Sequence, residues 1–319
     1  MSSRLLLLLV SAFMCLQSGL AKADYPERTI RFVLAGPAGG SVDLVARILA
    51  DRLRVALGQA VVVENRAGAA GAIAAQAVAS ADADGYTVLM TTSALAITPW
   101  MSPSSFDPIR DLVPVTRIAV ASYVLVVRQD LPVSTLDDFV AMAKAQPNLL
   151  TCSTYGVGSP PHLALELVKR AGNLGIVHAP YRAFGQALPD LMSGLLACAM
   201  EVPINAEQYV RSGMVRAIAV TSPKPLAMFP GATPLSDRFP GVVVEGWQGI
   251  FVPAGTPQPI VYRLNSEIVK IVQDPEIGTR LGELGFNPVG DSSEHASIVV
   301  KRDYDRFGDV IRSLNLKQE

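Results

Sequence analysis

VLAGPAGGSVDLVARILADRLRVALG, residues 33–58, joins the end of an apolar strand pattern to an amphipathic helix through a glycine-rich turn. Apolar residues alternate over residues 29–34, which predicts a strand, and recur at helical spacing over residues 42–57. Gly58 is a typical helix C-terminal residue. A strand that enters a helix in this way predicts an α/β fold.

The glycine-rich turn is typical of an anion site, because the N–H groups at a helix start point towards the preceding turn. Its spacing matches neither the dinucleotide fingerprint nor the P-loop, since Gly36, Gly39 and Gly40 are followed by Ser41 rather than by a Gly-Lys pair. We therefore predict that Gly39, Gly40 and Ser41 contact an organic anion other than a nucleotide. A plain strand-to-helix turn is the alternative interpretation.

The same alternation of strands and helices continues along the chain. Strands expected at 60–64 and 86–90, with a helix at 71–79, complete a βαβαβ unit with a parallel sheet. The pattern then restarts, with strands expected at 123–128, 149–152, 176–181, 196–201 and 215–221 and helices at 135–145, 160–171 and 185–193.

Two lobes follow from this restart. A Pro/Gly-rich stretch at 222–241 predicts a loop, and residues 247–252 predict a strand that returns to the first lobe. We expect one lobe at 24–121 plus 248–319, the other at 122–247, and a hinged cleft where the chain crosses twice between them.

The N-terminus has the pattern of an export signal. Arg4 precedes an apolar run at 5–16, and Ala21-Lys22-Ala23 follows. We expect a signal peptide at 1–23 that is cleaved after Ala23, because the apolar run is too short to span a membrane. A methionine precedes Cys15 where a lipobox needs a small residue, so we expect a soluble protein of the periplasm.

The charge balance argues against a nucleic-acid partner. Loss of residues 1–23 removes Arg4 and Lys22 and no acidic residue, so the net charge moves from −1 to −3. A nucleic-acid-binding chain is normally basic. We also expect no cofactor, since His162, His178 and His295 lack the spacing of a metal site.

Seven stretches of the chain together carry a resemblance to a known family; they lie at 25–47, 57–71, 83–90, 155–168, 176–194, 215–222 and 247–257. In this order they resemble the Bug receptors, the exported solute receptors of tripartite tricarboxylate transporters. The resemblance implies the fold of type II periplasmic binding proteins, in which two α/β lobes joined by two crossing strands close on a small organic carboxylate. It also implies membrane transporter subunits as partners, and we expect the receptor itself to be a monomer.

TYGVGSPPH, residues 154–162, is the candidate anion contact of the second lobe. Ser159 is the expected helix N-cap, and the two prolines after it have no N–H to offer a ligand. An anion on this side must therefore use Thr154, Gly158, Ser159 or the N–H of His162. We expect the His162 side chain to bond a neighbouring carbonyl rather than a ligand.

Further candidates come from three other strand ends. Ligands settle at the C-terminal edge of parallel strands, which favours Thr91, Thr92 and Ser93. Tyr181 and Arg182 end another strand, and Arg182 either pairs with a carboxylate or forms a salt bridge at the rim. Glu201 is a candidate acceptor for an amine or hydroxyl of the ligand.

Two features have structural interpretations. Asp43 lies in the first turn of its helix with Arg47 four residues later, which favours a role in the fold. Cys152 and Cys198 both fall in apolar strand patterns, and a disulfide needs their Cα atoms within about 7 Å. We expect two buried free thiols, although an oxidising compartment permits a bridge.

Two other classes of protein remain open from the sequence. An exported hydrolase is poorly supported, because the chain has no G-x-S-x-G elbow. A receptor that passes its closed state to a signalling partner needs the same two-lobed machinery as a transport receptor.

Overall fold

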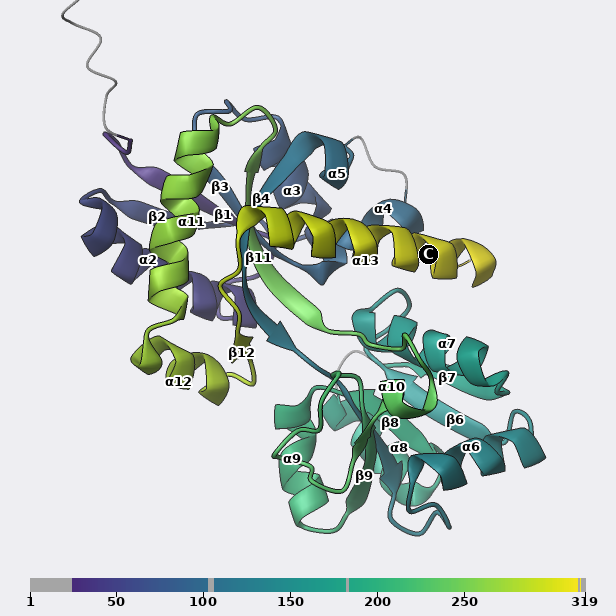
Figure 1. The fold of residues 1–319 in the computed structure, drawn as a ribbon. Coiled ribbons are helices and arrows are strands. Elements are labelled where there is room, and N and C mark those ends of the chain that lie inside the picture. The colour runs from purple at the N-terminus through teal and green to yellow at the C-terminus, as the bar shows by residue number, and fades with distance from the viewer. Residues whose placement is uncertain (1–24, 103–105, 182–183, 315, 317–319) are drawn as a thin grey trace, which may run out of the picture.

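Two six-stranded sheets organise the protein, whose computed structural model describes residues 25–102, 106–181, 184–314 and 316 (Figure 1). The expected signal peptide at 1–23 and Arg182 lie outside the described residues. In order across the first sheet, its strands are β12 (Asn287–Pro288), β4 (Leu112–Ala121), β11 (Gly246–Pro253), β3 (Thr87–Thr92), β1 (Ile30–Leu34) and β2 (Val61–Asn65).

The first sheet is mixed. Strand β1 pairs in parallel with β2 and β3, which confirms the βαβαβ prediction. Strand β11 lies antiparallel between β3 and β4, so the expected return strand completes the sheet. Strand β4 was not predicted, and without it the sheet has no edge for β12.

The second sheet is mixed as well. In order, its strands are β10 (Thr233–Pro234), β9 (Val215–Val220), β5 (Val124–Arg128), β8 (Cys198–Glu201), β6 (Leu150–Thr154) and β7 (Ile176–Pro180). Strand β5 is antiparallel to β8 and β9, whereas β6 is parallel to β7 and β8. All five strands expected for this lobe are present, and the predicted loop at 222–241 also contains β10 and a short helix.

Helices cover the sheets in two groups (Figure 1). Those around the first sheet are α2 (Ser41–Leu57), η1 (Ala69–Gly71), α3 (Ala72–Ala79), η2 (Ser93–Ala96), α4 (Thr98–Met101), α5 (Pro108–Asp111), α11 (Gln258–Val272), α12 (Pro275–Glu283) and α13 (Ser293–Leu314). Those around the second are α6 (Leu136–Ala145), α7 (Pro160–Gly172), α8 (Phe184–Ser193), α9 (Pro203–Arg211) and α10 (Leu235–Arg238).

Local signals in the sequence correctly placed several helix ends. Gly58 ends α2 in the left-handed conformation with φ 66°. Thr135 and Asp138 form a capping box at the start of α6, where the helix was expected to begin. Ser159 is the N-cap of α7. In each case the short-range chemistry that predicted the end also stabilises it.

The chain crosses between the sheets twice, and one buried side chain joins the two crossings. The first crossing leads from β4 to β5, and the second leads through residues 242–245 into β11. The Thr221 hydroxyl accepts a hydrogen bond from the Tyr123 N–H at 2.8 Å and donates one to the Val244 carbonyl at 2.5 Å. Because Thr221 is fully buried, these bonds hold the two crossings together.

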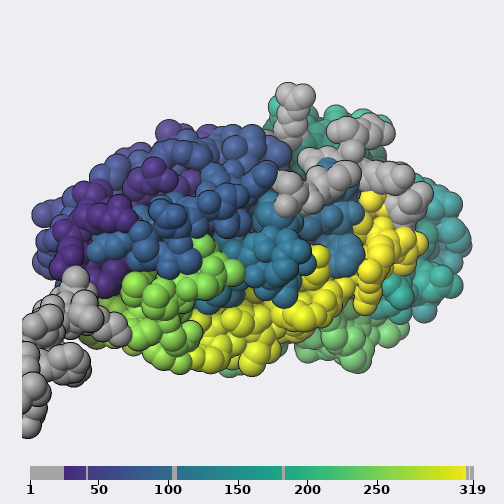
Figure 2. All heavy atoms as spheres, turned by 90° about the horizontal axis from the view of Figure 1, so that it is seen from above, coloured from purple at the N-terminus to yellow at the C-terminus, as the bar shows by residue number. Residues whose placement is uncertain are grey.

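Helix α13 runs along the first lobe and reaches the second. From above it forms a continuous yellow band beside α11 and extends towards teal residues of the second lobe (Figure 2). Its Ser313 hydroxyl lies within 3.5 Å of Arg170 in α7. In the part of the chain that the structure describes, no helix combines the length and apolarity that a bilayer crossing requires.

The expectation of two free thiols is wrong. Cys152 and Cys198 form a disulfide with a Cα–Cα distance of 4.5 Å. They are direct neighbours in the register of parallel strands β6 and β8. Apolar patterns located both strands correctly, but the sequence did not show that the strands are adjacent with the cysteines at the same level.

Candidate functional site

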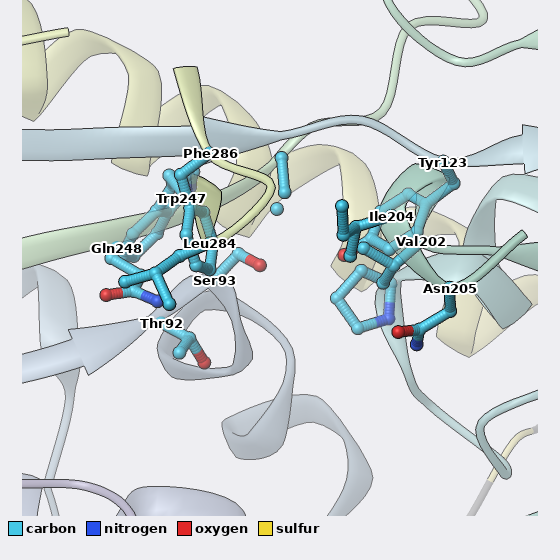
Figure 3. Close-up of a pocket in the computed structure, with 13 residues that line it drawn as sticks. Thr92, Ser93, Tyr123, Val202, Ile204, Asn205, Trp247, Gln248, Leu284 and Phe286 are labelled. Atoms are coloured by element: carbon cyan, nitrogen blue, oxygen red, sulfur yellow. The ribbon is translucent and has the colours of Figure 1, made fainter. Parts of the chain in front are cut away.

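A cavity of about 410 Å³ lies between the two sheets, beside both crossings. Figure 3 shows Trp247, Leu284 and Phe286 on one side of this space and Val202, Ile204 and Asn205 on the other. Its lining residues are Thr92, Ser93, Ala121, Tyr123, Pro160, Val202, Ile204, Asn205, Gly246, Trp247, Gln248, Leu284 and Phe286. Since both lobes contribute walls, a molecule held here contacts both.

Two predicted residues lie at the C-terminal end of β3 and line the cavity. The Thr92 side chain accepts a hydrogen bond from the Ala94 N–H at 3.3 Å, which caps the short helix η2. Ser93 is 1% exposed, and its hydroxyl points towards the cavity (Figure 3). Thr91, the third predicted residue of this strand end, is also buried but pairs with Gly249 of β11 and is not a lining residue.

Gln248 completes a polar group at this end of the cavity. It lies opposite Thr92 in the pairing of β11 with β3. The residue is 2% exposed, and its side-chain oxygen has no hydrogen-bond partner among the described residues. A buried unpaired amide oxygen is costly without a partner. This oxygen can only accept, so the group of Gln248 that can donate to a ligand carboxylate is its amide nitrogen, which lies on the cavity side in Figure 3.

Trp247 forms a fixed apolar wall of the cavity. Its indole N–H donates to Asp303 of α13 at 3.1 Å, and both residues are buried. Asp303 also pairs with Arg302 and Arg306, and Arg306 donates to the Val243 carbonyl at 2.5 Å. Helix α13 thus fixes the second crossing and the tryptophan that follows it.

Sequence reasoning missed Trp247 and Gln248 as site residues. Both lie in the stretch 247–257 that carries part of the family resemblance, and the same stretch was predicted to return to the first lobe. A strand that enters a sheet beside a crossing places its first side chains at the cleft, and that signal was available.

Glu201 lies directly behind one wall of the cavity rather than in its lining. Its side chain accepts hydrogen bonds from the Val202 N–H at 2.6 Å and from the Asn205 amide at 3.2 Å. Burial raises the pKa of Glu201 to about 7, and these two hydrogen bonds only partly oppose that rise. The carboxyl group therefore exchanges a proton near neutral pH beside two lining residues.

A second cavity of about 250 Å³ shares Pro160 with the first. Part of the candidate anion contact of the second lobe, residues 154–162, lines it. Gly158 and Ser159 line it. The Gly158 N–H donates to His162 Nδ1 at 3.0 Å, and the Ser159 hydroxyl donates to the Gly156 carbonyl at 2.9 Å. Both groups proposed for an anion are thus engaged within their own turn in this structure.

His162 has a structural environment, but its partner differs from the expected one. The ring accepts from an amide rather than donating to a carbonyl, and it stacks on His178 at 3.9 Å. Burial lowers the pKa of His162 to about 3 and that of His178 to about 4, so both rings are neutral. The Thr154 hydroxyl lies 2.7 Å from His178 Nε2, so this candidate ligand contact already has a hydrogen-bond partner within the protein.

The N-terminal glycine-rich turn satisfies most of its own hydrogen bonds. Gly39 donates its N–H to Asp43 at 2.9 Å, and Gly40 donates to the Pro37 carbonyl at 3.2 Å. For Ser41 only the backbone is described. Neither of the two cavities is lined by this turn, so its contact with an anion stays a prediction.

Asp43 has the structural role expected of it. It is 3% exposed, and its carboxylate accepts from Arg47 and Asn65 as well as from Gly39. The hydrogen bonds from Arg47 and Gly39 lower the pKa of Asp43 to about 2. The carboxylate therefore holds the turn together as an ion.

Tyr181 lines neither of the two cavities. Its hydroxyl donates to Asp190 of α8 at 2.5 Å, and its backbone N–H donates to the Thr154 carbonyl at 2.9 Å. Among the described residues, no group of three or more His, Cys, Asp or Glu side chains is arranged to hold a metal ion.

Comparisons with known proteins agree with this geometry. BugT of Bordetella pertussis is 33% identical over 297 residues, which cover 92% of this chain and 91% of BugT. A solved structure from R. palustris, with adipate, is 29% identical with a TM-score of 0.74 and covers 92% of this chain and 99% of its own. MatC from Rhodopseudomonas palustris, with bound malate, is 28% identical with a TM-score of 0.69 and covers 90% of this chain and 100% of its own.

The match to the family extends over most of the sequence. Residues 45–316 fit the profile described as "Tripartite tricarboxylate transporter family receptor". The two-sheet fold and the cavity between the sheets are those of a solute-binding receptor. The chain therefore belongs to the receptor family of tripartite tricarboxylate transporters.

Proposed function

We propose that the protein is a periplasmic receptor that captures a small organic carboxylate and delivers it to the membrane subunits of a tripartite tricarboxylate-type transporter. The observation that carries this proposal is the cavity of about 410 Å³ with walls from both sheets, next to both crossings. Its volume is within the range of small-molecule sites. Family membership and the acids bound by two related structures support the same conclusion.

The two lobes of this receptor comprise residues 24–121 plus 248–319 and residues 122–247. The strands of each sheet support this division, because each sheet takes its strands from one of the two lobes. Strand β11 starts at Gly246, just before the second boundary. The crossings joined through Thr221 are the hinge about which the lobes close. The receptor works as a monomer after cleavage behind Ala23, without a cofactor and without catalytic turnover.

The carboxylate lies at the polar end of the cavity. Ser93 supplies a hydroxyl, Gln248 an amide and Thr92 a second hydroxyl, and the three lie on neighbouring strand ends. Neutral donors suffice to hold a carboxylate when it is shielded from water, because each such hydrogen bond involves an ion. The other predicted contacts stay predictions: Gly39, Gly40, Ser41, Thr91, Thr154, Gly158, Ser159, His162, Tyr181, Glu201 and Arg182, the last of which lies outside the described residues.

A thermal-shift experiment tests this function. The protein is unfolded, dialysed free of bound solute, refolded and then heated with a panel of organic acids. We expect at least one acid to raise the melting temperature, because a ligand that binds only the folded state stabilises it by mass action. No shift with any acid would contradict the proposal.

A matched pair of variants locates the carboxylate end. Ser93→Ala should weaken binding of that acid several-fold in calorimetry, since it removes a buried donor. Ser193→Ala, at the exposed end of α8, is the control and should bind like the parent. Equal binding by both variants would place the carboxylate elsewhere.

A further inference from the structure

We propose that the cavity selects an organic acid with one carboxylate and an uncharged, largely apolar remainder, of the aromatic or alicyclic class, over a dicarboxylate. This inference rests on the proposed function, because it specifies the ligand of the same cavity. It is carried by the chemistry of the walls.

The first observation is the charge of the lining. None of the 13 residues that line the cavity has a charged side chain, and the polar ones are Thr92, Ser93, Asn205 and Gln248 together with the Tyr123 hydroxyl. One carboxylate can be served by the neutral donors at the Ser93 end. A second carboxylate would lose its hydration without gaining a cation, which is unfavourable.

The second observation is an acidic group behind the wall opposite Ser93. Glu201 bonds the side chain of Asn205 and the backbone of Val202, and both of those residues line the cavity. A ligand carboxylate placed against that wall would lie near a second carboxyl group, that of Glu201. The far end of the cavity therefore favours an uncharged group.

The third observation is that the facing walls are apolar and fixed. Trp247, Leu284 and Phe286 lie on one side of the cavity, and Val202 and Ile204 face them (Figure 3). Asp303 holds the Trp247 ring, so this wall is preorganised. A flat apolar body between such walls is removed from water on both faces.

A contact between the lobes closes this apolar space. A methyl group built on Gly285, between Leu284 and Phe286, would come within 3.0 Å of the Ile204 side chain. Ile204 in α9 therefore touches the segment after α12 across the cleft. A ligand that fills the space beside this contact binds both lobes through apolar surface.

Matched acids test the preference. Refolded, solute-free protein is titrated by calorimetry with benzoate against terephthalate and with cyclohexanecarboxylate against cyclohexane-1,4-dicarboxylate, so that each pair differs by one carboxylate on a similar body. We expect the monocarboxylate of at least one pair to bind tenfold or more tightly than its partner. Equal or tighter binding of the dicarboxylate in both pairs would overturn this inference but leave the proposed function intact. Binding of no organic acid would overturn both.

A pair of variants at the apolar wall gives an independent test. Ile204→Lys adds a cation at a residue that is 38% exposed, so the substitution is compatible with folding. It should shift the preference at least fivefold towards the dicarboxylate, whereas Ile204→Gln, polar but uncharged, should not. Melting temperatures establish that both variants are folded. An unchanged ratio in the lysine variant would contradict an uncharged far wall.

Arg182, which follows Tyr181 in the sequence, provides a last discriminating variant. If the parent prefers a dicarboxylate and Arg182→Ala abolishes that preference, Arg182 is the partner of a second carboxylate and the inference is overturned. If the parent prefers the monocarboxylate, Arg182→Ala should leave the ratio within twofold of the parent value.

Discussion

Two buried carboxyl groups at strand-to-helix turns, Asp43 and Glu201, differ in charge although each is 3% exposed. Asp43 accepts from the Arg47 guanidinium, the Gly39 N–H and Asn65, and its pKa falls to about 2. Glu201 has two neutral donors and no cationic partner among the described residues, and it lies deeper among protein atoms, so burial raises its pKa to about 7. Depth of burial and the charge of the donors together therefore decide the charge of each carboxyl group, although the two side chains are equally hidden from solvent.

The difference in charge distinguishes the turn of Asp43, which has a structural role, from the turn of Glu201, which lies behind one wall of the cavity. The Asp43 turn is complete in itself, since its carboxylate uses the hydrogen bonds that a ligand would otherwise receive from Gly39. The turn from β8 into α9 contains Glu201, whose two hydrogen bonds only partly oppose the rise in its pKa that burial causes. Perturbed acids of this kind are concentrated at functional sites.

The largest expected effect comes from cutting the disulfide that fixes strand β8. Cys152→Ala combined with Cys198→Ala opens a loop with a sequence separation of 46 residues. The chain-entropy relation gives a loss of about 4 kcal/mol in the free energy of unfolding. Because Glu201 lies on the same strand, water should reach it more easily and its pKa should fall, while the pKa of Asp43 stays unchanged.

Urea unfolding at pH 7 and NMR titration of carboxyl carbons measure both parts of this prediction. Parent protein reduced with a small thiol serves as the control, since it should lose the same stability without a substitution. Unchanged stability in both samples would show that β6 and β8 hold their places without the bridge.

The next effect is on the pH dependence of stability. The pKa of Glu201 is higher in the folded state than the ordinary value of 4.5 for a glutamate, so the folded protein binds more protons and stability falls as pH rises from about 4.5 to 7. Glu201→Gln removes this titration and keeps an acceptor for Val202. We expect the variant to be more stable than the parent by about 3 kcal/mol at pH 8.5 and by little at pH 4.5.

Urea unfolding of solute-free protein across this pH range checks the prediction, with Glu207→Gln, a half-buried acid on α9 that pairs with the exposed Arg211, as the control for loss of one charge. A constant difference between Glu201→Gln and the parent at all pH values would show that Glu201 does not titrate in this range.

The sequence predicted the elements better than their arrangement. Apolar periodicity located β1, β5 and α2, because each buries one face or both faces of its own segment. It did not reveal that β6 and β8 are neighbours, and that information decides the Cys152–Cys198 bridge. Adjacency in a mixed sheet depends on contacts between distant segments, which local pattern does not encode.

The sequence predicted the site only in part, because local pattern does not show which distant segments meet at the cavity. Thr92 and Ser93 follow from the rule that ligands settle at strand ends, and both line the cavity. Leu284 and Phe286 come from a segment after α12 for which no element was predicted, and only the folded chain brings them opposite Ile204. Gly39 and Gly40 had the expected sequence signal, but Asp43 and Pro37 accept their N–H groups.

A smaller effect is expected at the structural carboxylate. Asp43→Asn removes the charge that Arg47 and Gly39 bond, with a loss of about 2 kcal/mol in the free energy of unfolding at pH 7. The pKa of Asp43 is lowered, so its contribution to stability is present above the ordinary aspartate value of 3.8 and is lost as pH falls through about 2. Variant and parent should therefore converge in strong acid. Asp51→Asn, exposed on the same helix, is the control and should match the parent by thermal unfolding at pH 7.

The smallest expected effect is a fine adjustment of the Glu201 pKa. Asn205 donates one of the two hydrogen bonds that oppose the rise in this pKa, so Asn205→Ala should raise it further, by less than about one unit. Tyr155→Phe is the matched control, because the Tyr155 hydroxyl accepts from the same Asn205 amide and not from Glu201. NMR titration of both variants, with Glu201→Gln to assign the signal, measures the shift. A lower pKa in Asn205→Ala would mean that the wider cavity lets water reach the carboxyl group, and that hydration outweighs the lost hydrogen bond.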